Sequence, residues 1–169
     1  MALEEGRAGR FLRIVNRAED GILIVLLTGM IGVAIAQIFL RNFLGAGISW
    51  ADPLLRILVL WVGLAGAMVA TRMDNHVTIN VFSRYLPPRT RHGARVIVDV
   101  FTAGVCALIA WHAARFVALE RSYGTIAFGD VPAWMTELIL PLAFAVIALR
   151  YSALALRRGW QLFTAGPPA

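Results

Sequence analysis

The stretch GILIVLLTGMIGVAIAQIFL, Gly21 to Leu40, carries no charged residue and is bracketed by Asp20 and Arg41. Twenty residues of α-helix rise about 30 Å, which matches the hydrocarbon thickness of a bilayer. A buried helix of a soluble domain rarely stays uncharged on every face over that length. This segment therefore predicts a transmembrane helix over residues 21–40.

Three further apolar segments extend the same pattern through the chain. They cover residues 53–71, 96–114 and 132–149. Pro53 falls in the first turn of its segment, where a helix tolerates proline. A soluble four-helix bundle would carry polar stripes at helical spacing, and these segments largely lack them. We expect an all-α integral membrane protein with four transmembrane helices.

The composition agrees with a membrane protein of one domain. Hydrophobic residues make up 59% of the 169 residues, and the mean hydropathy is +0.72. The chain has more hydrophobic residues than the core of one soluble domain needs, and we expect the remaining ones to face lipid. Four spans and short loops account for a single membrane domain over residues 1–169. Ahead of the first span, residues 7–18 place apolar and arginine side chains on different sides, which predicts an interfacial amphipathic helix.

All 16 basic residues are arginines, and their positions predict the orientation. Twelve lie in the two terminal tails and in the loop between the second and third spans, and four lie in the other two loops. Cytoplasmic segments are the ones enriched in basic residues. We therefore expect both termini in the cytoplasm. This topology also accounts for the net charge of +6 without a nucleic-acid partner.

Ionisable residues inside the spans are the first candidates for function. Asp99 lies four residues after Arg95 near the cytoplasmic end of its span, so we expect either a helical ion pair with Arg95 or snorkelling to the interface. His112, Arg115 and Glu137 come to the outer side on the expected topology, where we predict a polar layer. Nothing in the spacing of residues predicts a catalytic site, a substrate site, a metal site or a cofactor, and we do not expect an enzyme.

Several motifs, taken in their order along the chain, resemble the pattern of a known family. Arg41-Asn42 ends the first span, and SWADPLLR (Ser49 to Arg56) opens the second. The motifs that follow are WVGLAGAMVATR (61–72), HVTINVF (76–82), YLPPRTR (85–91) and VPAWMTELILPLAFAVIALR (131–150). Over roughly residues 41–150 the chain resembles the DctQ family, the small membrane subunit of tripartite ATP-independent periplasmic (TRAP) transporters. The family often has two adjacent acidic residues after the tryptophan, whereas here Asp52 precedes Pro53.

The resemblance implies an inner-membrane scaffold for a large permease subunit, with a periplasmic solute-binding protein as a further partner. It also implies sodium-coupled uptake of an organic anion, with substrate and sodium bound by the large subunit. We expect a set of seven residues in the second span and its flanks to fix that helix and to contact the large subunit. They are Trp50, Asp52, Arg56, Trp61, Gly63, Gly66 and His76.

Two alternatives come from other classes of membrane protein. A small drug exporter acting as a homodimer should carry an acidic residue deep in an early helix, and residues 21–40 have none. A membrane haem protein needs two histidines at matching depth. His112 is expected near the outer face, whereas His76 and His92 fall in the inner loop.

Overall fold

The chain is almost entirely helical. The computed structural model describes the backbone of residues 2–45, 47–77 and 88–164, and the side chains of residues 13–45, 47–72 and 93–160. Its elements, in chain order, are α1 (Ala2–Phe43), α2 (Ala51–Val77), α3 (Pro88–Tyr123), β1 (Ile126–Phe128), β2 (Val131–Pro132), α4 (Ala133–Glu137) and α5 (Ile139–Thr164).

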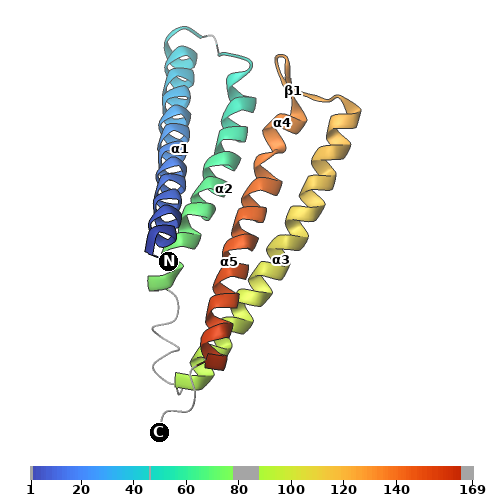
Figure 1. Cartoon of the computed structure of the whole chain (residues 1–169). Coiled ribbons are helices and arrows are strands. Elements are labelled where there is room, and N and C mark those ends of the chain that lie inside the picture. Colours follow the sequence, from blue (N-terminus) through green and yellow to red (C-terminus); the bar gives the residue numbers. More distant parts are fainter. Residues whose placement is uncertain (1, 46, 78–87, 165–169) are drawn as a thin grey trace.

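The long helices pack in the spatial order α1, α2, α5, α3 (Figure 1). The α1–α2 loop and the β1–β2 hairpin lie at one end of the molecule, here called the hairpin end. The opposite end, here called the terminal end, holds the start of α1 and the end of α5. Among the described residues, four helical stretches are long and apolar enough to cross a membrane: Arg13–Phe43, Ala51–Arg72, Gly93–Tyr123 and Ala133–Trp160. The four expected spans are therefore confirmed.

The buried core is small and lies where α2, α3 and α5 meet. Cys106, Ile147 and Ala148 are buried there, with Met68 and Phe144 packed against them. Many large apolar side chains on the helices are instead exposed. In water so much exposed apolar surface would be costly, whereas lipid or another membrane subunit can cover it.

Helix α1 runs without interruption through both ranges that the sequence assigns to an amphipathic helix and to the first span. No turn separates residues 7–18 from residues 21–40 in the helix. The placement of the first range along the membrane surface stays a prediction, and the side chains of residues 1–12 lie outside the described ones.

The fourth span differs from the expected single helix over 132–149 because it is divided at Leu138. The short α4 ends at Glu137, and α5 begins at Ile139. Pro141 has no amide hydrogen for the carbonyl of Glu137, and its ring crowds that carbonyl. The proline thus explains why regular helical bonding stops one turn before it.

A two-stranded antiparallel hairpin joins α3 to α4 at the hairpin end. Gly124 and Gly129 adopt φ values of 66° and 55°, which residues with a side chain rarely take. The amide of Ala133 donates to the carbonyl of Thr125 at 2.9 Å, so the start of α4 is bonded to the start of the hairpin.

Candidate partner interface and the polar contacts behind it

An ion network at the terminal end joins three of the long helices. Arg72 of α2 pairs with Asp20 of α1 and lies 3.5 Å from a second α1 carboxylate, that of Glu19. Arg150 of α5 donates to the other oxygen of Glu19 at 2.5 Å. The same guanidinium donates to Thr71 Oγ1 at 3.1 Å. The Glu19 carboxylate thus ties α1 to both α2 and α5, a role that its position beside the first span did not predict.

A second ion pair joins α3 to α5 at the same end. Asp99 Oδ2 lies 2.6 Å from Arg158 Nη1, and Asp99 is only 3% exposed. The expected helical pair with Arg95 is corrected by this contact, because the side chain of Asp99 is turned inward to α5. A buried carboxylate with an arginine partner has a structural explanation and needs no role in transport.

At the hairpin end, Gln37 closes the loop between α1 and α2. Its side-chain amide accepts from the Ile48 amide at 3.1 Å and donates to the Ile48 carbonyl at 3.4 Å. Its nitrogen also lies 3.5 Å from Asp52 Oδ1. Asp52, one of the expected interface residues, is therefore in contact with Gln37 of α1, while the nearby Trp50 is 48% exposed.

Trp61 also makes a contact within the chain. Its indole Nε1 donates to the backbone carbonyl of Thr136 at 2.8 Å and so connects α2 to α4. Thr136 lies at the end of a five-residue helix, where carbonyls lack donors from their own helix. The tryptophan supplies such a donor from α2.

The opposite side of α2 is open. Its exposed residues follow helical spacing and form a line, here called the α2 stripe: Asp52, Arg56, Val59, Leu60, Gly63, Ala67 and Ala70. A methyl group added at Gly63 or at the half-buried Gly66 would meet no atom of another helix within 4 Å. Of the expected interface residues, Asp52, Arg56 and Gly63 lie on this stripe, and the side chain of His76 lies outside the described residues.

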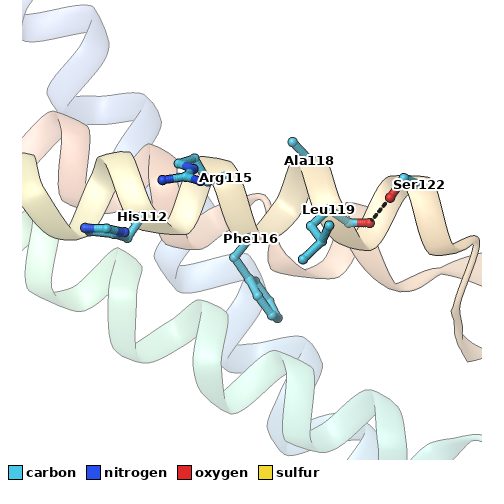
Figure 2. Close-up of a pocket in the computed structure, with 6 residues that line it drawn as sticks. All are labelled: His112, Arg115, Phe116, Ala118, Leu119 and Ser122. Carbon is cyan, nitrogen blue, oxygen red and sulfur yellow. Dashed lines mark hydrogen bonds between the residues drawn. The ribbon is translucent and has the colours of Figure 1, made fainter.

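Two of the three residues of the expected polar layer lie together on α3. His112 and Arg115, one turn apart, line an open concavity of about 660 Å³ with Phe116, Ala118, Leu119 and Ser122 (Figure 2). All six residues belong to α3, and Figure 2 shows them projecting to different sides of that helix. The concavity is a surface feature of one helix and not an enclosed binding site.

Glu137, the third residue, is the last residue of α4 and does not line that concavity. Its Oε2 is buried and has no hydrogen-bond partner among the described residues. The charge that acts on it most is that of Glu120, near the end of α3. The sequence alone could not reveal this neighbour because the two residues belong to different helices.

Groups of acidic, histidine and cysteine side chains that could hold a metal ion are absent from the described part of the chain. Cys106 is buried as a free thiol in the small core. The polar groups of the described residues thus serve mainly to join helices, and the α2 stripe remains as an open surface.

Comparison with known proteins gives a consistent set of relatives. The chain is 24% identical over 140 residues to the sialic acid TRAP transporter permease protein SiaT of Haemophilus influenzae, covering 83% of this chain and 23% of that protein. It is 28% identical over 127 residues to the sialic acid TRAP transporter small permease protein SiaQ of Vibrio cholerae, covering 73% and 71%. With the ectoine TRAP transporter small permease protein TeaB of Halomonas elongata it shares 23% identity over 154 residues, covering 90% and 79%.

The four apolar helices define a multi-pass membrane protein of all-α architecture. Residues 30–162 match the family of the DctQ component of tripartite ATP-independent periplasmic transporters. The chain belongs to this family, and it is a small permease component of the bacterial inner membrane and not an enzyme. It spans only 23% of the length of SiaT, so that protein's whole activity does not pass to it directly.

Proposed function

We propose that this chain scaffolds a large permease subunit and helps a periplasmic solute-binding protein dock, for sodium-coupled uptake of an organic anion. Both termini then lie in the cytoplasm, and the hairpin end faces the periplasm. Two relatives are named for sialic acid, an organic acid, which supports that class of solute. SiaT supports a large-subunit partner, because in that protein a region like this chain is part of a much longer permease chain.

The observation that carries the proposal is the α2 stripe. Its middle and its terminal-end half consist of Gly63, Ala67 and Ala70, and no described residue of the chain comes near an added Cβ at Gly63. Small residues in a line allow two membrane helices to approach closely, and close packing drives their association in lipid. The opposite side of α2 already contacts α5. The stripe is therefore the side of α2 that is free to receive a helix of the large subunit.

Co-purification of the two subunits tests this face. In Gly63→Leu the added Cβ meets no atom of another helix of the chain, so the subunit should fold normally but lose the large subunit during extraction in mild detergent. Gly104→Leu is the matched control, because Gly104 lies exposed on α3 and an added Cβ there also meets nothing. Equal recovery of the large subunit with both variants would rule out the stripe as the contact face.

A second copy of this chain is the competing occupant of the same face. Chemical cross-linking in native membranes separates the two possibilities by mass. A cross-linked pair of the small subunit that disappears in Gly63→Leu would support the homodimer instead of the scaffold.

A further inference from the structure

The segment between Glu120 and Glu137, here called the hairpin cap, is connected by its own local contacts. It contains the end of α3, the β1–β2 hairpin and α4. Thr125 Oγ1 donates to the Glu120 carboxylate, and Ala133 donates from its amide to the Thr125 carbonyl. The guanidinium of Arg121 lies 5.3 Å from the ring centre of Trp134, in a cation–π contact. These contacts hold the hairpin, the end of α3 and the start of α4 to one another.

The attachment of the cap to α5 is weaker than that of an unbroken helix. Regular bonding stops at Leu138, and Pro141 removes the donor that would reach the Glu137 carbonyl. The next bond across the break, from the Leu142 amide to the Leu138 carbonyl, is 3.3 Å long. Proline is a common cause of a bend in a helix, and α4 therefore receives less support from α5 than it would within one continuous helix.

The hydrogen bond from Trp61 reaches the hairpin cap at a residue that precedes the break at Leu138. The Thr136 carbonyl that it binds precedes Leu138, so the bond runs from α2 to α4 and not to α5. Trp61 is two residues from Gly63, so its side chain points about 160° around the helix from the direction of Gly63. One side of α2 thus carries the exposed α2 stripe, while another side is hydrogen-bonded to the cap.

We infer that Trp61 is a positioning residue that couples the two sides of α2. A large subunit packed on the α2 stripe fixes the position of α2, and the indole bond passes that position to the hairpin cap. The cap, at the end assigned to the periplasm, then presents a set orientation to the solute-binding protein. The inference rests on the proposed function for the identity of both partners, while the bond itself does not depend on it.

The first test measures amide hydrogen exchange in the full-length subunit, both alone and in the purified complex. Trp61→Phe keeps an aromatic ring on α2 and removes only the N–H donor. We expect faster exchange in peptides covering residues 125–138 and no change in α1. Trp111→Phe is the control, because Trp111 is 66% exposed on α3 and precedes the first residue of the cap, Glu120. The same exchange in both variants would overturn the inference.

The second test measures how tightly the solute-binding protein binds the complex. One hydrogen bond contributes on the order of 1 kcal/mol, so Trp61→Phe should weaken this binding by about fivefold if cap orientation governs it. Recovery of the large subunit should stay unchanged, which a general folding defect would not allow. Normal affinity together with normal assembly would contradict the coupling.

Pro141→Ala provides a third arm, which also serves if Trp61→Phe alone does not purify. Alanine restores an amide donor for the Glu137 carbonyl and should continue the helix across Leu138. In this background Trp61→Phe should have a smaller effect on exchange, because α5 then holds α4 directly. An undiminished effect would contradict a role for the break.

Failure of the large subunit to co-purify with the unchanged chain would count against the proposed function alone, since the exchange arm tests the bond in the isolated subunit.

Discussion

Asp99 of α3 and Arg158 of α5 form an ion pair with 2.6 Å between Oδ2 and Nη1, in a region where the Asp99 side chain is 4% exposed and that of Arg158 is 19% exposed. The two residues are separated by 59 positions in the sequence. The pair joins the two helices that pack most extensively in the bundle. Because Asp99 is more deeply buried than Arg158, replacing one of the two residues should change the stability of the protein more than replacing the other.

Removal of the arginine should destabilise the protein more than removal of the carboxylate. Arg158→Met leaves the buried Asp99 without this cation and should cost about 3 kcal/mol. Asp99→Asn should cost less, because the long arginine side chain can reach water or lipid headgroups. Thermal unfolding of the purified subunit in detergent compares the two variants. Equal losses, or a larger loss for Asp99→Asn, would contradict this account of the pair.

Glu19 should matter more than its neighbour Asp20 for holding α1 to the bundle. Glu19 contacts both Arg72 and Arg150, whereas Asp20 pairs with Arg72 and its side chain is 52% exposed. We expect Glu19→Gln to cost about 1–2 kcal/mol and Asp20→Asn less than about 1 kcal/mol. Limited proteolysis between α1 and α2 should be faster in the first variant. Identical cleavage rates would show that the Glu19 contacts do not hold α1.

Gln37 should stabilise the loop between α1 and α2. Gln37→Leu has similar volume but leaves the Ile48 amide and carbonyl without their side-chain partner, at a cost of about 1–2 kcal/mol. Amide exchange at residues 47–52 should increase. Gln37→Glu retains an acceptor for the Ile48 amide but places a charge beside Asp52, so it should restore only part of the protection. Full protection in Gln37→Leu would contradict the role of this side chain.

The orientation of the chain can be tested by labelling of single cysteines. With the buried Cys106 replaced by alanine, Asp130→Cys in the hairpin should react with a membrane-impermeant maleimide added to intact cells. Arg157→Cys, exposed on α5, should react only after the membrane is opened. The opposite pattern would reverse the topology that the arginine distribution predicts.

The sequence predicted the four spans because length and hydropathy are local properties. Gly21 to Leu40 has no charge, and α1 includes the whole of that segment. The division of the fourth span also had a local signal, since Pro141 identifies the Glu137 carbonyl as the one that loses its donor. The family resemblance over residues 41–150 lies within the 30–162 region that the family matches.

Contacts between helices could not be predicted from the sequence, because they depend on how segments far apart in the chain pack together. Asp99 was given its helical neighbour Arg95 as a partner, whereas the ion pair uses a residue of α5. The indole bond from Trp61 to α4 depends on the rotation of α2, which the sequence does not give, while contact of Trp61 with the large subunit stays a prediction. The family resemblance picks out residues of α2 by their sequence motifs. Only the packing of the helices shows which residues of α2 lie on the α2 stripe and which lie on the side that contacts α4 and α5.

The central claim is that this chain works as a scaffold in complex with a large permease subunit. The most direct measurement is purification of the tagged chain from its native membrane in mild detergent, with mass spectrometry of the proteins that accompany it. The account predicts stoichiometric recovery of a large multi-helix permease protein. Recovery of the chain alone, or of a homodimer that transports solute by itself in liposomes, would contradict it.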